Sequence, residues 1–158
     1  MFLGIIIFML AFQDRTRKAI FLTLLSVAFA NPLTDFFKHA FPMHRPFQPQ
    51  ELGHLVILRV GYASSMGTAS GHSANMSAVA VMMTLCLGAW GYPWIAIALI
   101  TGFSRIYCGA HYPWQVALGY TCGITVSTVL YYLTQKYIPV LRIEKINSPK
   151  PEISCQAT

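Results

Sequence analysis

The sequence predicts an all-α protein, a multi-pass transmembrane helical bundle with about four full spans and a partial N-terminal helix. The first observation is composition: 55% of the 158 residues are apolar and only 10% are charged, whereas soluble domains carry about 25% charged residues. The second is a mean hydropathy of +0.52. The third is a series of long apolar stretches separated by polar segments. Together they exclude a disordered chain, a coiled coil and a disulfide-stapled secreted module.

Residues 1–12 are apolar but fall short of the roughly 20 residues that a spanning helix needs. The segment lacks the charged start and the small-residue cleavage site of a signal peptide. We therefore expect a partial helix here, the remnant of a longer one whose beginning is absent from this chain. A polar segment, residues 13–18, follows it.

The predicted membrane spans are four apolar segments, of which the third is shorter than the others: residues 19–38, 73–90, 94–108 and 114–137. A long loop, residues 41–68, separates the first two spans. The chain after Pro139 is polar and interrupted by proline. We therefore expect a membrane-embedded domain over residues 1–137 and a polar cytoplasmic tail over residues 138–158.

The basic residues predict the orientation of the spans. They gather before the first span and after the last, at Arg15, Arg17, Lys18, Lys136, Arg142 and Lys145. Because successive spans alternate in direction, both groups fall on the same side, which the positive-inside rule assigns to the cytoplasm. The long loop and the short link at residues 109–112 are therefore expected on the extracytoplasmic side of an integral membrane protein (the inner membrane, if the source is a bacterium).

The excess of basic residues could also indicate a nucleic-acid-binding protein, which the composition excludes. The chain has 11 Lys and Arg against 5 Asp and Glu, a net charge of +6. Because these residues are scattered along a hydropathic chain, they offer no surface for DNA, and no nucleic-acid partner is expected. The four cysteines form no CxxC pair, so we assign them no chemistry.

Polar and ionisable residues cluster where the spans meet the extracytoplasmic side. Lys38 closes the first span, Ser70-Gly71-His72 opens the second, Arg105 closes the third and His111 opens the fourth, while Arg45 lies in the long loop. Ionisable residues are costly at a membrane and therefore mark functional sites. Three cations and two imidazoles on one face predict a site for a polyanion, and phosphate suits the fork of Arg, the point charge of Lys and the amides at a helix N-terminus.

The runs KHAFPMHRP, SGH and SRIYCGAH resemble the three-part signature of the type 2 phosphatidic acid phosphatase superfamily, K-x6-RP, PSGH and SR-x5-H-x3-D. The resemblance covers roughly residues 35–123. Members of this family are helical membrane phosphatases, or soluble acid phosphatases and vanadium haloperoxidases on the same helical core. For the phosphatase branch the resemblance implies hydrolysis without a metal, through a phosphohistidine.

The resemblance also implies residue roles. His111 matches the nucleophile, and His72 matches the general acid that protonates the leaving oxygen. The phosphate-binding positions are Lys38, Arg45, Arg105, the hydroxyl of Ser70 and the backbone of Gly71. Asp35, one helical turn before Lys38, is expected to pair with Lys38 or Arg45, either in support of the site or only to neutralise charge near the interface.

The chain departs from the signature at two positions. Ala69 replaces the usual Pro, which changes the entry to a helix but not the chemistry. Gln115 replaces the Asp that orients the nucleophilic His. A Gln oxygen can still accept the ring N–H and fix the tautomer, but it cannot stabilise an imidazolium by charge. The run SRIYCGAHYPWQ is similar to the glucose-6-phosphatase branch, which also carries Gln there.

These features predict a membrane phosphatase that acts on a lipid-linked phosphate or diphosphate, without a cofactor or a metal. A metal site built from His39, His44 and His54 is not expected, because their spacing matches no ligand pattern. The residues leave three alternatives open: a phosphotransferase, a sugar-phosphate phosphatase, and a non-catalytic homologue that binds lipid phosphate. The expected partners are a lipid phosphate and membrane lipids, and a homo-oligomer or a partner subunit is a further option because the chain is short.

Overall fold

The computed structural model describes residues 14–53, 55–62 and 65–143, and this part of the chain is helical without strands. The helices are α2 (Asp14–Ala40), α3 (Gly71–Leu87), α4 (Tyr92–Tyr107) and α5 (Pro113–Tyr137). Two short 3₁₀ turns, η1 (Gly88–Gly91) and η2 (Pro139–Leu141), follow α3 and α5. The predicted all-α class is confirmed.

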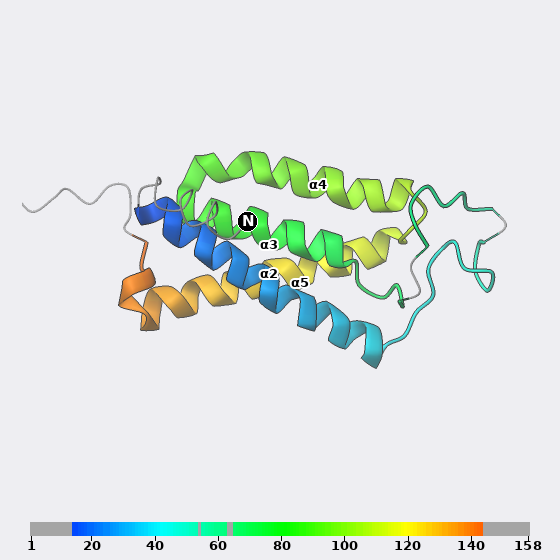
Figure 1. Cartoon of the computed structure of the whole chain (residues 1–158), viewed down its shortest axis with the longest axis horizontal. Helices are drawn as coiled ribbons and strands as arrows, with labels where there is room; N and C mark the ends of the chain where they lie inside the picture. The colour runs from blue at the N-terminus through cyan, green and yellow to red at the C-terminus, as the bar shows by residue number, and fades with distance from the viewer. Residues whose placement is uncertain (1–13, 54, 63–64, 144–158) are drawn as a thin grey trace, which may run out of the picture.

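The four helices run in alternating directions, so that one end of the bundle carries the long loop and the other carries η1 (Figure 1). Helix α3 lies at the centre and packs against α2, α4 and α5. The long loop, the end of α4 and the start of α5 gather at the same end of the bundle (Figure 1). Residues that are far apart in sequence, from the end of α2 to the start of α5, are therefore brought to one place.

Local sequence explains where α3 and α5 begin and why the chain turns back after α3. The Oγ of Ser70 accepts a hydrogen bond from the N–H of Ser73 and caps α3. The side-chain oxygen of Gln115 accepts the N–H of Tyr112 at the start of α5, with Pro113 as the first helical residue. Gly88 ends α3 with a φ of 64°, which glycine adopts without steric cost.

Close packing between α3 and α5 depends on two glycines. A Cβ at Gly119 would collide with the carbonyl oxygen of Ser70, and a Cβ at Gly123 would collide with that of Ala74. Across the same contact the Oγ of Ser77 donates to the carbonyl of Tyr120, and that of Ser127 donates to the carbonyl of Ala78 at 3.0 Å. Small residues that let helix backbones approach are typical of membrane bundles.

Within the described residues, three helical stretches are long and apolar enough to cross a membrane: Asp14–Ala40, Gly71–Tyr107 and Pro113–Tyr137. The second contains α3, η1 and α4, which fold back on one another (Figure 1). With 16 residues, α4 is shorter than the roughly 20 residues of a full span, so the fourth span stays a prediction. The chain is an integral membrane protein, and α2, α4 and α5 expose apolar side chains that suit lipid, among them Phe29, Phe103 and Tyr132.

Helix ends differ from the predicted spans by a few residues. Helix α2 begins at Asp14, five residues before the predicted span, and its first turn carries the Asp14–Arg17 ion pair. Trp90, predicted at the end of the second span, lies in η1. Helix α5 ends at Tyr137, but the two-domain division stays a prediction. The expected N-terminal helix and residues 144–158 of the predicted tail lie outside the described residues.

The described members of the two groups of basic residues that predicted the orientation share one end of the bundle, while Lys145 lies outside the described residues. Lys18, near the start of α2, donates from Nζ to the carbonyl oxygen of Arg142 at 3.1 Å. Arg142 in turn donates from Nε to the carbonyl of Gln135 in α5. The described members of both groups therefore lie opposite the long loop (Figure 1). The side of the membrane on which each end lies stays a prediction.

Candidate active site

A cavity of about 400 Å³ lies at the end of the bundle that carries the long loop. Five side chains predicted for the site line it: Lys38, Arg45, His72, Arg105 and His111. They come from the last turn of α2, the long loop, the first turn of α3, the last turn of α4 and the link before α5. Three cations and two imidazoles therefore face one cavity, and the positive charge suits an anion such as phosphate.

Arg45 is buried, and hydrogen bonds along most of its length hold it in place. Its Nε donates to the carbonyl oxygen of Ser65 at 2.8 Å, and Nη2 donates to the Ser65 hydroxyl at 3.0 Å. Nη1 lies 3.1 Å from Nε2 of His111 and 3.4 Å from the carbonyl of Ala110. A guanidinium fixed in this way has lost its conformational freedom before an anion binds.

The contacts of His111 determine which ring nitrogen carries the hydrogen. Nδ1 lies 3.1 Å from the carbonyl oxygen of Gly67 and 3.1 Å from Oε1 of Gln115, and both of these atoms only accept. Nε2 faces Arg45, which only donates. The hydrogen therefore sits on Nδ1, and the lone pair of Nε2 points toward the guanidinium at the cavity.

Gln115 is fully buried and its amide is held on both sides. Oε1 accepts from the N–H of Tyr112 and faces Nδ1 of His111, while Nε2 donates to the carbonyl oxygen of His44 at 3.0 Å. The donor to His44 fixes which end of the amide faces the imidazole. Gln115 therefore contacts both His111 and the loop residue that precedes Arg45, and its predicted role in orienting His111 stays a prediction.

The pKa of His111 falls from its ordinary 6.5 to about 4. The main cause is burial, which disfavours the charged ring, and the second is the positive charge of Arg45. The hydrogen bonds to Gln115 and Gly67 act in the opposite direction but do not offset these two causes. At neutral pH the ring is therefore neutral, and the unprotonated Nε2 accepts from Arg45.

Three of the predicted phosphate ligands differ in how they are held. Nζ of Lys38 pairs with Oδ1 of Asp35 at 2.8 Å, so the pairing predicted for Asp35 is to Lys38 rather than Arg45. Nε of Arg105 lies 3.3 Å from Oγ of Ser104. Ser70 is fully buried, and its Oγ accepts from the hydroxyl and the N–H of Ser73. The Ser70 side chain therefore caps α3.

Ser70 and Gly71 are not among the residues that line the cavity in the described part of the chain. A Cβ at Gly71 would meet no atom within 4 Å, so its backbone borders open space. Their predicted contact with phosphate stays a prediction.

Sequence reasoning missed the parts of the site that the loop backbone supplies. The carbonyls of Gly67 and Ser65, which hold His111 and Arg45, belong to no motif. Gln48 was also missed: its Oε1 accepts from the N–H of Arg45 and lies 2.8 Å from Nδ1 of His44. Backbone acceptors carry no signal in the residue types, because every residue has a carbonyl.

Two histidines that were not expected to act, His39 and His44, are not among the residues that line the cavity. Nδ1 of His39 contacts the carbonyl of Asp35, and Nδ1 of His44 contacts Gln48. His54 lies outside the described residues. Within residues 14–53, 55–62 and 65–143, no group of three or more His, Cys, Asp or Glu is arranged to hold a metal ion.

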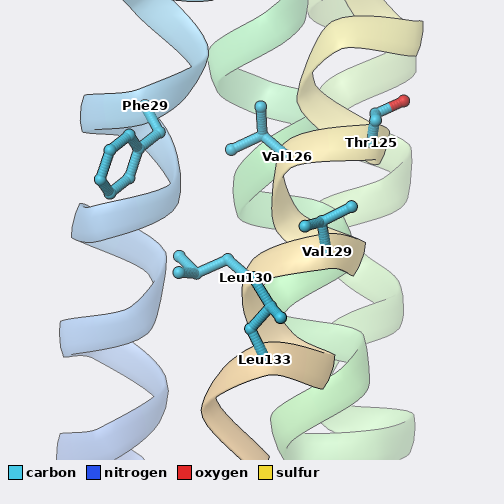
Figure 2. Close-up of a pocket in the computed structure, with 6 residues that line it drawn as sticks. All are labelled: Phe29, Thr125, Val126, Val129, Leu130 and Leu133. Carbon is cyan, nitrogen blue, oxygen red and sulfur yellow. The ribbon is translucent and has the colours of Figure 1, made fainter.

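A second cavity, of about 320 Å³, lies between α2 and α5 and differs sharply from the first. Phe29 comes from α2 and the other five lining residues come from α5 (Figure 2): Thr125, Val126, Val129, Leu130 and Leu133. None of these side chains is titratable. This groove therefore offers nothing to bind a phosphate.

Comparisons with known proteins give one family. The family model described as PAP2 superfamily matches residues 18–139. The chain is 31% identical over 98 residues to the undecaprenyl-diphosphatase BcrC of Bacillus subtilis (strain 168), covering 62% of this chain and 47% of that protein. It is 28% identical over 132 residues to the lipid A 4'-phosphatase of Porphyromonas gingivalis, covering 79% of this chain and 56% of that protein.

A third relative is the bacitracin transport permease protein BcrC of Bacillus licheniformis, 22% identical over 134 residues, which cover 85% of this chain and 64% of that protein. The chain thus spans about half to two thirds of the length of these relatives. No solved structure matches it.

Proposed function

Because this chain belongs to the PAP2 superfamily, we propose that it is a membrane phosphatase that removes phosphate from a lipid-linked phosphate or diphosphate. Two of its relatives are named as phosphatases of a lipid diphosphate and of lipid A. A substrate of this kind fits an integral membrane protein whose cationic cavity lies at one end of its helices.

One observation carries the proposal: the contact of His111 Nε2 with Arg45 Nη1, while Nδ1 is held by Gly67 and Gln115. The unprotonated nitrogen and the cation that donates to it, which is also able to bind phosphate oxygens, are adjacent. Only a neutral imidazole can attack phosphorus, and burial of His111 keeps the ring neutral at pH 7 by lowering its pKa.

In the first step, Nε2 of His111 attacks phosphorus and the bond from phosphorus to the leaving oxygen breaks. His72, on the same cavity, donates a proton to that oxygen. The ring of His111 then carries the phosphoryl group on Nε2 and a positive charge. Oε1 of Gln115 and the carbonyl of Gly67 stabilise that charge through the Nδ1 hydrogen, as dipoles rather than as a full negative charge.

In the second step, water attacks the phosphorus of the phosphohistidine and gives a proton to His72. The P–N bond breaks, inorganic phosphate leaves, and His111 regains its lone pair. Lys38, Arg45 and Arg105 supply positive charge to the phosphoryl oxygens in both steps. Because these cations fill the role that a divalent ion has elsewhere, we propose that the reaction is independent of metal.

The positive-inside rule supports a site on the extracytoplasmic side. Arg17, Lys18 and Arg142 lie at the end of the bundle opposite the cavity. A lipid phosphate in the outer leaflet would thus reach the site without crossing the bilayer.

The test is phosphate release by the purified full chain in lipid vesicles, with phosphatidic acid, a polyprenyl diphosphate and p-nitrophenyl phosphate as substrates. We expect the parent to release phosphate in the presence of EDTA, and His111→Ala to lose at least about a thousandfold in rate. A matched control is His39→Ala, since His39 contacts only a helix carbonyl in the described chain.

Two results would contradict the proposal. His111→Ala as active as the parent would eliminate the phosphohistidine. A folded parent that binds phosphatidic acid but releases no phosphate from any substrate would support the non-catalytic alternative instead.

A further inference from the structure

A third cavity, of about 250 Å³, shares His111 as a wall with the site but lies between the long loop and the end of α4. Its other walls include Leu52, Ile57, Arg59 and Tyr107. The family signature assigns nothing to these four residues. The cavity is mainly apolar and contains one cation, which is a combination that suits an amphiphile with an anionic group.

Arg59 is fixed at this cavity without an ion-pair partner among the described residues. Its guanidinium lies 4.9 Å from the centre of the Tyr107 ring, and its backbone N–H donates to the carbonyl oxygen of Cys108 at 3.2 Å. The nearest acidic loop residue, Glu51, accepts from the hydroxyl of Tyr112 instead. The positive charge of Arg59 therefore remains available to an anion.

The surroundings of Arg59 place it at the level of lipid headgroups. Tyr107 stacks on Phe103, with ring centres 6.3 Å apart, and both rings are more than 60% exposed on α4. Farther along the same helix, Leu99 and Ile100 are equally exposed, as expected for a lipid-facing surface. Tyr at the end of such a surface and Arg beside it are the residue types found at a membrane–water interface.

The loop next to Arg59 also exposes apolar side chains. Leu55 and Ile57 are each about 70% exposed, and Leu52 is 43% exposed. The loop is held firmly against α4: Gly109, with φ of 69°, leaves room for Val56, whose Cγ1 would lie 2.5 Å from a Cβ there. Large apolar side chains displayed by an anchored loop at the end of membrane helices are explained by contact with lipid rather than with water.

We propose that Arg59 and Tyr107 form a binding site for the phosphate of an anionic membrane lipid, in the leaflet on which the His111 cavity opens. Leu52, Leu55 and Ile57 contact the acyl-chain boundary of the same leaflet. The bound lipid would hold the long loop, and with it Arg45, at the membrane surface. The inference does not depend on catalysis by His111.

The first experiment measures lipid adducts of the detergent-purified full chain by native mass spectrometry, with phosphatidylglycerol and phosphatidylcholine as probes. We expect the parent to retain phosphatidylglycerol in preference to phosphatidylcholine. Arg59→Gln should lower phosphatidylglycerol occupancy about fivefold, the effect of one cation near an anionic surface. Arg142→Gln, which removes an exposed cation at the opposite end, should not.

Two outcomes of that experiment would overturn the proposal. Equal losses in Arg59→Gln and Arg142→Gln would mean general attraction to negative lipid. A loss in Arg105→Gln without a loss in Arg59→Gln would place the lipid in the catalytic cavity.

The second experiment reports where the loop lies. Ile57→Trp is reconstituted in vesicles of phosphatidylcholine and phosphatidylglycerol, and its emission is compared with that of the parent, which has tryptophans of its own. Brominated acyl chains should quench the added emission strongly, and aqueous acrylamide weakly. The reverse pattern would place Ile57 in water and overturn the proposal. Release of phosphate from p-nitrophenyl phosphate is measured alongside, so that failure of this inference and failure of the phosphatase proposal are distinguished.

Discussion

Nη1 of Arg45 donates to Nε2 of His111 across 3.1 Å, and this single contact fixes the chemistry of both residues. Because Arg cannot accept, Nε2 must be unprotonated. The nitrogen expected to attack phosphorus and the cation expected to bind the phosphoryl oxygens are thus arranged around the same point.

Gln115→Leu should lower both activity and stability. It leaves the N–H of Tyr112 without this acceptor and the Nδ1 hydrogen of His111 with the carbonyl of Gly67 alone, and an unpaired buried group costs about 1 to 3 kcal/mol. The imidazole should also lose one of the two contacts that orient it, and kcat should fall about a hundredfold. Steady-state kinetics and thermal unfolding in the same detergent would measure the two effects.

Ser127→Ala is the control for Gln115→Leu. Ser127 is equally buried and donates to the carbonyl of Ala78, away from the cavity. It should lower the unfolding temperature with little effect on kcat. If Gln115→Leu behaved in the same way, Gln115 would be only a packing residue.

Gln115→Asp should remain active, because a carboxylate can also accept the Nδ1 hydrogen. The carboxylate should raise the pKa of His111 and move the acid limb of the pH–rate profile upward. It cannot donate to the carbonyl of His44, as Nε2 of Gln115 does. Complete inactivity of this variant, with the fold intact, would mean that the hydrogen bond to His44 matters more than the orientation of His111.

In the pH–rate profile, His111 should remain neutral and able to act as the nucleophile well below pH 6.5. His111 is neutral above its pKa of about 4, so the acid limb of kcat/KM that it causes should lie near pH 4. Arg45→Gln removes the second cause of the lowered pKa, and the limb of its residual activity should move upward while staying below 6.5, because burial remains. An acid limb at 6.5 in the parent would contradict a buried, neutral His111.

The same pKa makes stability depend on pH. Because His111 binds a proton less readily in the folded chain than in the unfolded one, the unfolded state takes up more protons as the pH falls. The contribution of neutral His111 to the free energy of unfolding should be complete above about pH 6.5. It should be lost as the pH falls from 6.5 to 4. Thermal unfolding of the parent and of His111→Asn over this range would measure the difference, and equal slopes would contradict it.

Gly67→Ala should damage the site through packing alone. A Cβ at Gly67 would lie 2.7 Å from Cγ of Arg45 and 3.0 Å from Oε1 of Gln115. Both side chains must then shift, and a displacement of this kind costs on the order of a hundredfold in rate. Activity of Gly67→Ala equal to that of the parent would show that the close contacts of Gly67 are not needed by the site.

Asp35→Asn should strengthen phosphate binding. The carboxylate pairs with Lys38 at 2.8 Å but is largely exposed, so the pair contributes only about 0 to 1 kcal/mol to stability. Without it, Lys38 offers its full charge to the cavity, and KM should fall up to about fivefold with an unchanged unfolding temperature. Asp14→Asn, which removes the Asp14–Arg17 pair, is the matched control and should leave KM unaltered. A rise in KM for Asp35→Asn would mean that Asp35 holds Lys38 in place.

Much of the fold was predictable from the hydropathy of each segment and from the alternating direction of successive spans. Arg17 and Arg142 predicted that the first and last helices share an end opposite the long loop, and the Lys18–Arg142 contact places them there. Span length was harder to predict, because Tyr92–Tyr107 is apolar throughout yet ends after 16 residues. The turns at Gly91 and Cys108 set where this helix begins and ends, and hydropathy alone does not predict them.

For the site, residue types and spacing predicted which side chains meet but not what holds them. Lys38, Arg45 and His111 come to one cavity, as expected from the order of the spans. The acceptors that position them are carbonyls of Ser65 and Gly67 in the long loop. The path of that loop depends on contacts made only after the helices have packed, so it left no pattern in the sequence.

The bare backbone of Gly119 and Gly123 against α3 has a consequence for how the sequence can vary. Any larger residue at these two positions would push α5 away from the carbonyls of Ser70 and Ala74, and so would tilt the link that carries His111. Lipid-facing positions such as Leu99 and Phe103 face no such neighbour and can exchange among apolar residues freely. Sequence variation in this protein should therefore be concentrated at its apolar, lipid-facing positions. It should be very small where α3 and α5 pack together.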